Sequence, residues 1–388
     1  MTFFTPSEIL RAYEKARKSR KNKYEVYLFD QNREERLMKM LHEINTGCYV
    51  HGTYKELILQ DSKKRYIASP QFLDHIVHHL IYARLYPILD RKMVQTSFAC
   101  RVGYGSHQAV TYLRKLLIKI QKKHGEDTYY CKIDFSKYFF TINHAFLKEK
   151  IRKYMRDPIL LGAIDCIIDS YISGNRYDEL LSNNHFYIDE PKKGVPIGGI
   201  LSQLFANFYL NDFDQFLKHT MKIRSVRYMD DCIFLGSKEE ICESIECMQK
   251  FCLEEKLILR TEKIKIHPIH DGVRFCGYQI IDRKLLAGKR ICLGFHKFMD
   301  RLDHISETEK ESRILTPDDR KKLMSIYASR SGCFAITDSG SSYVSKRGSA
   351  EFIRGGNGNN GANAGVFTLN LNWDASTANR NVGFHSLQ

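Results

Sequence analysis

Apolar and polar residues alternate along the chain with two different periods, and together these predict a mixture of helices and strands. Residues 1–45 have a helical pattern. Apolar side chains recur every three or four positions at 72–89 and again at 108–122, so each stretch is predicted to be a helix that faces a core. A further helix is predicted to begin at Ser237, because a glutamate three residues later completes a capping box.

Shorter apolar runs predict strands. Five runs of this kind are Tyr129–Ile133, Ile223–Tyr228, Cys232–Leu235, Leu257–Ile266 and Val273–Ile281. The second and third flank Met-Asp-Asp, a length that fits a tight hairpin. Strands and helices alternate without a strict βαβ repeat, so the pattern favours an α+β fold with helices packed on one face of a sheet.

The net charge of the chain indicates what kind of partner it binds. Sixty Lys and Arg against 45 Asp and Glu give a net charge of +15, which suggests a polyanionic partner. A basic protein without a nucleic-acid partner remains the alternative. A basic run between Arg11 and Lys23 fits either a solvated helix face or a contact with a phosphate backbone.

The cysteines and the apolar runs indicate the cellular compartment of the protein. None of the 11 cysteines forms a CxxC pair, and Cys242, Cys247 and Cys252 have a spacing that suits packing in a helix better than a zinc site. We therefore expect buried free thiols. No signal-peptide pattern and no membrane-length apolar run occurs, so we expect a cytoplasmic protein without a membrane partner.

The composition changes near the C-terminal end of the chain. Residues 337–350 are rich in Ser and Gly, which indicates a linker. Residues 354–388 contain eight Asn, one Asp and no Lys, and they are too few to bury a core of their own.

Three carboxylates are candidates for catalysis. Asp134 follows the first predicted strand, and Asp230 and Asp231 lie at the hairpin tip. Nucleotidyl transfer uses two divalent ions roughly 3.5–4 Å apart, and Mg²⁺ prefers carboxylate oxygens. Neighbouring residues in a strand point to opposite faces, so one member of the Asp pair could be less directly bound.

These residues lie in segments that resemble the boxes of reverse transcriptases. Arg227-Tyr228-Met229-Asp230-Asp231 resembles the Y-x-D-D box of that family. The other matching segments, which follow one another in family order over about residues 60–280, are Arg65–Pro70, Phe98–Ser106, Lys132–Phe139, Gly194–Gln203, Glu262–Lys263 and Phe275–Tyr278.

The resemblance implies a right-hand polymerase with fingers, palm and a short helical thumb. The palm would be an antiparallel sheet with helices on one face. The expected divisions are 1–125 for an N-terminal extension and fingers, 126–140 for the first catalytic box of the palm, 141–190 for fingers and palm helices, 191–285 for palm, 286–335 for thumb, and 336–388 for linker and tail.

The resemblance also assigns roles in catalysis. Asp134, Asp230 and Asp231 would bind two Mg²⁺ ions, or Mn²⁺, with help from the backbone carbonyl of Phe135. Lys263 would donate a proton to the leaving pyrophosphate, although the nearby Lys265 is an alternative.

Further positions would bind substrates. Arg65, with Lys64, would hold the triphosphate, and the ring of Phe139 would act as the steric gate that excludes a 2′-hydroxyl, unless Tyr138 does so. The remaining implied contacts are Ile197, Gly198 and Gln203 with the nucleotide, Gly277 and Tyr278 with the primer end, and Arg101, Ser202 and Tyr228 with the template RNA.

One departure from most reverse transcriptases narrows the resemblance. Ile197-Gly198 and Ser202-Gln203 stand where most of the family have Gln-Gly and Ser-Pro. This combination is similar to that of bacterial or phage-encoded diversity-generating retroelements, whose enzymes copy a template-repeat RNA with errors opposite adenine and use a small basic accessory variability protein. A neutral substitution is the alternative. The Asn-rich tail then fits an incidental translation of template-repeat sequence, or a polar low-complexity tail.

The resemblance thus implies an RNA-directed DNA polymerase that makes cDNA, as an RNA–DNA hybrid, from deoxynucleoside triphosphates. A retron-like or group II intron-derived enzyme without a mutagenic role is the first alternative. A catalytically inactive RNA-binding scaffold would not need all three carboxylates. An RNA polymerase usually has G-D-D, whereas this chain has Met229 before its Asp pair.

Overall fold

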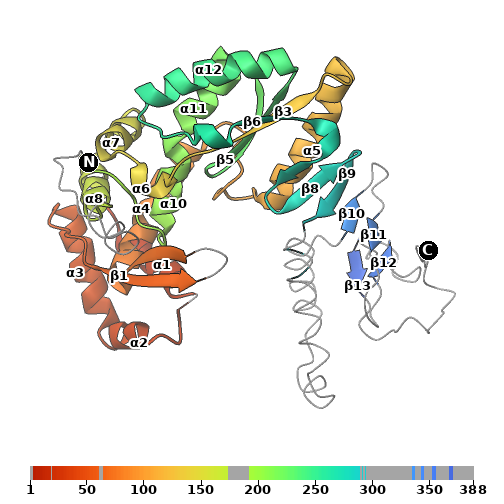
Figure 1. Cartoon of the computed structure of the whole chain (residues 1–388). Helices are drawn as coiled ribbons and strands as arrows, with labels where there is room; N and C mark the ends of the chain where they lie inside the picture. The colour runs from red at the N-terminus through yellow and green to blue at the C-terminus, as the bar shows by residue number, and fades with distance from the viewer. Residues whose placement is uncertain are drawn as a thin grey trace. The chain divides into compact units, whose positions relative to one another are not determined.

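A computed structural model describes residues 3–18, 20–60, 64–173, 192–288, 291 and 293, together with four short strands between 334 and 369. The chain divides into two compact units. The first comprises residues 1–104, 132–233 and 242–264, and the second comprises residues 105–131, 234–241 and 265–388 (Figure 1).

The N-terminal part of the first unit is helical, as predicted. Its helices are α1 (Pro6–Arg17), α2 (Tyr24–Gln31) and α3 (Arg33–Asn45). The start of α1 is fixed by a capping box in which Thr5 and Glu8 exchange hydrogen bonds. Glu8 also accepts hydrogen bonds from Arg84 on α4 (Phe72–Asp90), and this links the two helices. The predicted helix at 72–89 is confirmed.

A two-stranded ribbon lies between these helices in the chain. The strands β1 (Tyr54–Gln60) and β2 (Lys64–Pro70) pair antiparallel, with Tyr54 opposite Pro70. Ala68 on β2 is fully buried, whereas Leu57, Ile58 and Leu59 on β1 are exposed. The ribbon therefore takes part in the core mainly through β2, with Tyr54 of β1 packed against the cluster that contains Ala68.

The central sheet has the strand order β4-β5-β3-β6. Its strands are β3 (Tyr129–Asp134), β4 (Arg224–Tyr228), β5 (Asp231–Gly236) and β6 (Lys265–Pro268). The interior residues Ile133, Val226 and Ile233 have no exposed surface, so the predicted apolar strands are confirmed as core strands. Short helices follow β3 along the chain, namely α6 (Tyr138–Thr141), α7 (His144–Arg152) and α8 (Pro158–Asp169).

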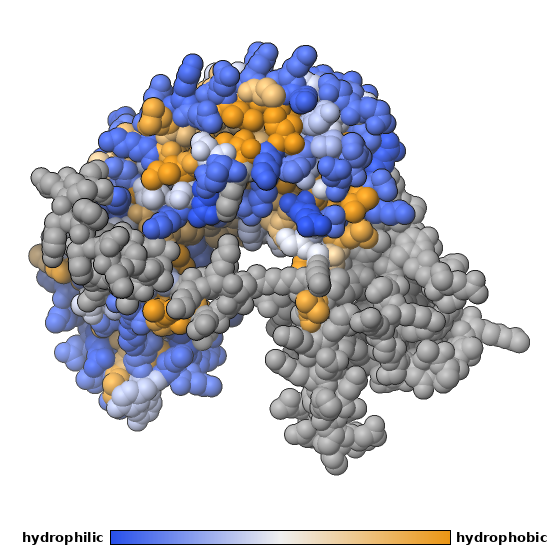
Figure 2. Space-filling model, in the orientation of Figure 1, coloured by the Kyte–Doolittle hydropathy of each residue, from blue (hydrophilic) through white to orange (hydrophobic). Residues whose placement is uncertain are grey.

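The helices around the hairpin complete this region. They are α10 (Ile200–Tyr209), α11 (Asn211–Gln215), the π-helical turn η1 (Phe216–Thr220) and α12 (Lys238–Glu254). The predicted capping box of α12 is present, because Ser237 and Glu240 hydrogen-bond to each other's backbone amides. In Figure 2 hydrophilic residues predominate at the top of the view, where Figure 1 places α12.

The second unit contains a helix and an antiparallel sheet. The helix α5 (Ser106–His124) confirms the one predicted at 108–122. The sheet has the order β11-β10-β9-β8-β7, from β7 (Val273–Phe275), β8 (Tyr278–Ile281), β9 (Lys284–Ala287), β10 (Phe334–Ile336) and β11 (Ser342–Val344). Strands β12 (Phe352–Arg354) and β13 (Phe367–Leu369) form a separate pair.

Two predicted strands are wrong in extent. The run 273–281 is a hairpin and not one strand, because Cys276 and Gly277 both adopt positive φ and turn the chain between β7 and β8. The run 257–266 is interrupted by the 3₁₀ turn η2 (Thr261–Lys263), and a second 3₁₀ turn, η3 (Ile269–Asp271), follows β6. Apolar pattern alone does not reveal these local turns.

The predicted thumb at 286–335 and the tail at 354–388 fall almost entirely outside the described residues. The nine cysteines of the described part are free thiols, as expected, but the expected burial is wrong for Cys48, Cys100, Cys242 and Cys247, which are exposed. Of the trio on α12 only Cys252 is buried. None of the described helices is both long and apolar enough to span a bilayer.

Candidate active site

Three acidic residues are brought together at one end of the central sheet. Asp134 is the last residue of β3, and Asp231 is the first residue of β5, which lies next to β3. Asp230 lies in the two-residue connection between β4 and β5. Residues that are about a hundred positions apart in the sequence therefore meet at this end of the sheet.

Asp230 is partly buried, and its pKa reflects both this burial and the charges of its neighbours. Burial raises the pKa of Asp230 above its ordinary value, and the negative charges of Asp231 and Asp134 raise it further. Lys132 opposes this rise. The repulsion among three nearby carboxylates would be relieved by a bound cation, so the electrostatics favour cation binding here.

Asp134 is held by the segment that follows α12. Its Oδ2 lies 3.3 Å from a guanidinium nitrogen of Arg260, and its carbonyl accepts a hydrogen bond of 3.1 Å from the Arg260 amide. Ser136 donates its amide to Ile258, which extends the pairing. The strand end that carries Asp134 is therefore fixed by backbone pairing as well as by an ion pair.

Asp231 has a cationic partner of its own. The Nζ of Lys132 lies 3.0 Å from Asp231 Oδ1, and both side chains are about two-fifths exposed. Lys132 lies on β3 two residues before Asp134, so the neighbouring strands β3 and β5 each contribute one member of the pair. Such a solvated contact can be exchanged at small cost.

The donor set suits a hard divalent cation such as Mg²⁺, because all three side chains are carboxylates. In the part of the chain that the structure describes, however, no three His, Cys, Asp or Glu side chains are already arranged to hold a metal ion. Lys132 and Arg260 contact two of the carboxylates instead. The three carboxylates therefore fit a divalent cation in the type of their donor atoms and in their common location at one end of the sheet.

Phe135 and Lys263, the two other predicted catalytic residues, lie close in the sequence to Asp134 and Arg260. Phe135 is buried, and the two hydrogen bonds that join its segment to residues 258–260 use the Asp134 carbonyl and the Ser136 amide. Neither bond uses the Phe135 carbonyl. Lys263 lies at the end of η2, three residues beyond Arg260, and its side chain is outside the described part.

The two candidate gate aromatics differ in their surroundings. Tyr138 is buried and donates its hydroxyl hydrogen to the carbonyl of Ala206 on α10. Phe139 is half-buried, and its ring contacts Tyr138 edge to face with centroids 5.9 Å apart. Phe139 is therefore the more accessible of the two residues, and it has more surface with which a nucleotide could make contact.

The segment Gly194–Gln203, which we call the second box, is hydrogen-bonded both to Phe139 and to the β1–β2 ribbon. Val195 donates its amide to the carbonyl of Phe139 at 2.8 Å, and Ala68 on β2 donates its amide to the carbonyl of Ile197 at 3.0 Å. Gly198 has a φ of +139°, and a Cβ there would lie 3.2 Å from the Ala68 carbonyl oxygen. This position therefore requires glycine, because the ribbon approaches the backbone so closely.

The predicted substrate contacts differ in accessibility. Gln203 is exposed on α10 and Ile197 is half-buried, whereas Ser202 is buried. Tyr228, the last residue of β4, is half-buried. Lys64 and Arg65 lie in β2, but their side chains are outside the described part.

Arg101 has internal partners. Its guanidinium contacts Asp90 at 2.7 Å and donates to the carbonyls of Val94 and Ser97, and the side chain is only 4% exposed. The Arg101 guanidinium is therefore occupied by internal partners, and this bonding does not favour the predicted contact with template RNA. Internal bonding of this kind ties a loop to the end of α4.

The predicted primer residues belong to the second unit. Gly277, at φ +84°, forms the turn between β7 and β8, and Tyr278 begins β8 with its side chain buried. The ring of Tyr278 lies near that of His107 on α5, with centroids 6.2 Å apart. Their relation to the primer end stays a prediction.

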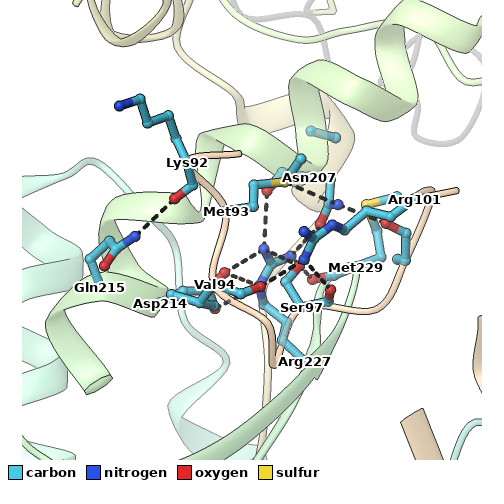
Figure 3. A network of polar contacts seen from close by, with 12 residues as sticks. Lys92, Met93, Val94, Ser97, Arg101, Asn207, Asp214, Gln215, Arg227 and Met229 are labelled. Carbon is cyan, nitrogen blue, oxygen red and sulfur yellow. Dashed lines mark hydrogen bonds and ion pairs between the residues drawn. The ribbon is translucent and has the colours of Figure 1, made fainter. Parts of the chain in front are cut away.

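Sequence reasoning missed a buried polar network behind the hairpin. Figure 3 shows Arg227 surrounded by Asp214, Asn207 and Ser97. Burial lowers the pKa of the Arg227 guanidinium, whereas the charge and hydrogen bonds of Asp214 raise it. The net effect is a raised pKa. The available signal was an arginine in a strand predicted to belong to the core, because a buried arginine requires a buried partner.

Comparison with known proteins identifies the family of this chain. The family described as reverse transcriptase (RNA-dependent DNA polymerase) matches residues 56–280, which is more than half of the chain. The chain therefore belongs to the reverse transcriptase family. The matched region contains β2, the second box, the β4–β5 hairpin and β7.

Similar curated proteins share the same region at low identity. Protein YkfC of Escherichia coli K12 is 23% identical over 265 residues, which cover 59% of this chain and 66% of YkfC. The group II intron-encoded protein LtrA of Lactococcus lactis is 24% identical over 188 residues, 47% of this chain and 28% of LtrA. The chain thus spans about two-thirds of one relative and less than a third of the other.

Among solved structures, apo telomerase from Candida tropicalis lacking its C-terminal domain aligns with a TM-score of 0.43 at 14% identity. The alignment covers 59% of this chain and 53% of the telomerase chain. The family assignment does not depend on this distant similarity.

Proposed function

We propose that this protein is an RNA-directed DNA polymerase whose active site is formed by Asp134, Asp230 and Asp231. The observation that carries the proposal is the meeting of the β3 end with the β4–β5 hairpin, which places three carboxylates within electrostatic reach of one another. The family supplies the reaction class, and the carboxylates supply the chemistry that such a reaction needs.

Each group at the site would have its own role in nucleotidyl transfer. The carboxylates would hold two Mg²⁺ or Mn²⁺ ions, which activate the primer hydroxyl and stabilise charge on the leaving pyrophosphate. Lys132 and Arg260 would neutralise Asp231 and Asp134 until the cations bind. Lys263 would protonate the leaving group.

Substrate recognition would come from the surroundings of the hairpin. Lys64 and Arg65 would bind the triphosphate, and the half-buried ring of Phe139 would exclude a 2′-hydroxyl. Ile197, Gly198 and Gln203 would line the nucleotide site, and Ser202 and Tyr228 would support the template. Gly277 and Tyr278 would contact the primer end.

Primer extension on a defined RNA tests the activity. The wild-type chain should extend a DNA primer with deoxynucleotides, and Asp230→Ala should reduce the rate by about a thousandfold or more. Asp127→Ala removes an exposed carboxylate that precedes β3 and serves as the matched control, with no expected effect. Equal extension by wild type and Asp230→Ala would contradict the role of Asp230, and no extension by wild type would instead support an inactive RNA-binding scaffold.

We further propose that the enzyme is error-prone opposite template adenines, as in diversity-generating retroelements. The support is the pair Ile197 and Gln203 within the second box. Ile197 is half-buried and fixed through its carbonyl to β2, so its aliphatic side chain replaces an amide at a restrained position. Loss of a polar group there removes a hydrogen-bonding check on the base pair.

Sequencing of the cDNA made from a defined RNA tests this subtype. Wild type should misincorporate more often opposite adenine than opposite the other three bases, and Ile197→Gln should reduce that excess. An even error spectrum would favour a retron-like or intron-derived enzyme without a mutagenic role. The template-repeat RNA and a small basic accessory protein are the partners that this subtype requires.

A further inference from the structure

Arg227 is the largest fully buried side chain among the described residues. It lies in β4, two residues before Met229 and three before Asp230. A buried guanidinium is costly unless each donor has a partner. Its partners therefore indicate what the burial achieves.

The guanidinium is saturated with hydrogen bonds. It binds the Asp214 carboxylate on α11 through Nε and a terminal nitrogen, at 2.6–2.9 Å. The other donors reach the side chain and the carbonyl of Asn207 on α10 and the hydroxyl of Ser97, all at 2.9–3.0 Å. One further hydrogen bond goes to the connection Met229-Asp230 between β4 and β5, which we call the catalytic turn.

That contact is with the backbone of Met229. One terminal nitrogen of Arg227 donates to the Met229 carbonyl at 2.8 Å and to the Asn207 amide oxygen at 2.9 Å (Figure 3). Met229 has a φ of +57°, a conformation that costs a residue with a side chain about 1 kcal/mol or more. The hydrogen bond to its carbonyl opposes relaxation of this backbone.

The same arginine joins a third segment by its backbone. Its amide donates to Thr96 and its carbonyl accepts from Phe98, each at 2.9 Å, and Asn207 donates to the carbonyl of Ala99 at 2.7 Å. Arg227 and Asn207 therefore join three parts of the chain by hydrogen bonds, namely α10, the segment at 96–99 and the catalytic turn.

We propose that Arg227 is a positioning residue that sets the backbone of the catalytic turn, and hence the direction of the Asp230 carboxylate, against α10. The inference rests on the proposed function, because it concerns the same carboxylates. Arg227 touches neither substrate nor metal in this role. A purely structural anchor would affect stability alone.

The test separates the turn contact from the ion pair. In the double variant Arg227→Met/Asp214→Leu both buried charges are removed together, so no unpaired charge is left in the core. In Arg227→Lys the pairing with Asp214 is kept while the planar fork that reaches Met229 is lost. Folding is checked by circular dichroism, and Arg227→Lys carries the test should the double variant not fold.

Both variants should lower kcat for primer extension by about ten- to a hundredfold while KM for the deoxynucleotide changes less than about threefold. Both should also weaken Mn²⁺ binding, measured directly by electron paramagnetic resonance, by about three- to tenfold. Wild-type kcat and Mn²⁺ affinity in a folded variant would overturn the proposal.

Lys150→Met is the matched control. Lys150 is a buried cation that pairs with Asp212 and Glu255 and is not bonded to the turn. Its loss should lower the unfolding temperature but leave kcat and Mn²⁺ affinity unchanged. If the wild-type chain makes no DNA at all, the proposed function fails, and the Mn²⁺ affinities still decide whether Arg227 positions the turn.

Discussion

The guanidinium of Arg260 and the carboxylate of Asp134 form an ion pair with a nitrogen–oxygen distance of 3.3 Å, although the two residues are 126 positions apart. The pair places a cation beside a carboxylate that we assign to metal binding. Arg260 and a metal ion would compete for the same oxygen atoms. This competition has a measurable consequence.

Arg260→Gln should lower the Mg²⁺ concentration needed for half-maximal primer extension by about two- to fivefold, because a partly exposed ion pair contributes up to about 1 kcal/mol. A titration of initial rate against Mg²⁺ measures the change. Lys250→Gln, which removes an exposed cation on α12, controls for net charge and should have no effect. An unchanged or higher Mg²⁺ requirement in Arg260→Gln would contradict the competition.

Gly198→Ala should lower the free energy of unfolding by about 1–3 kcal/mol, since φ is +139° and the new Cβ would meet the Ala68 carbonyl oxygen at 3.2 Å. Urea unfolding gives this value. The control is Gly162→Ala within α8, where a Cβ meets nothing within 4 Å and stability should rise by about 0.5–1 kcal/mol. Equal stability of Gly198→Ala and wild type would show that the approach of β2 is not tight.

Phe139→Ala should reduce the preference for deoxynucleotides over ribonucleotides by about tenfold or more, because the half-buried ring would no longer exclude a 2′-hydroxyl. The ratio of kcat/KM values for the two nucleotides measures this. Tyr138→Phe removes only the hydrogen bond to Ala206, so it should cost about 1 kcal/mol of stability and keep the preference. The opposite pattern would identify Tyr138 as the gate.

Glu8→Gln should destabilise the protein in a pH-dependent way. Hydrogen bonding to Arg84 lowers the pKa of Glu8 to about 2 in the folded state, from an ordinary value of 4.5. The pair therefore stabilises the fold above about pH 4.5, and this contribution is lost as the pH falls toward 2. Because both groups are partly open to water, we expect a difference of about 1–2 kcal/mol at pH 7.

Chemical unfolding of wild type and Glu8→Gln between pH 7 and pH 2 checks this expectation, and the difference between the two curves should shrink toward the acidic end. Glu14→Gln changes an exposed glutamate on the same helix and should follow wild type throughout. A constant difference between wild type and Glu8→Gln across the range would mean that the Arg84 contact does not depend on the charge of Glu8.

The local elements of the site could be predicted from the sequence because each has a local signal. The strand that ends at Asp134 and the hairpin around Asp230 follow from short apolar runs with a tight connection between them. The capping box at Ser237 is likewise a four-residue pattern. These predictions needed no knowledge of which segments meet in space.

The contacts that fix the site could not be predicted in this way, because they join distant segments. Neither the pair of Arg260 with Asp134 nor that of Arg227 with Asp214 has a spacing that would indicate it. The resemblance assigned Arg101 to the template RNA, and it gave no sign of the internal partners that bind the Arg101 guanidinium. The Cys276-Gly277 turn was hidden in an apolar run.

The central claim is that Asp134 and Asp230 act on the same metal ions. Single-turnover primer extension by Asp134→Asn, Asp230→Asn and the double variant tests this claim most directly. We predict that each single change lowers the rate by about a thousandfold or more, and that the double variant is no slower than the slower single variant, because residues that act as a unit are not additive. A single variant with the wild-type rate, or a double variant whose losses multiply, would contradict the account.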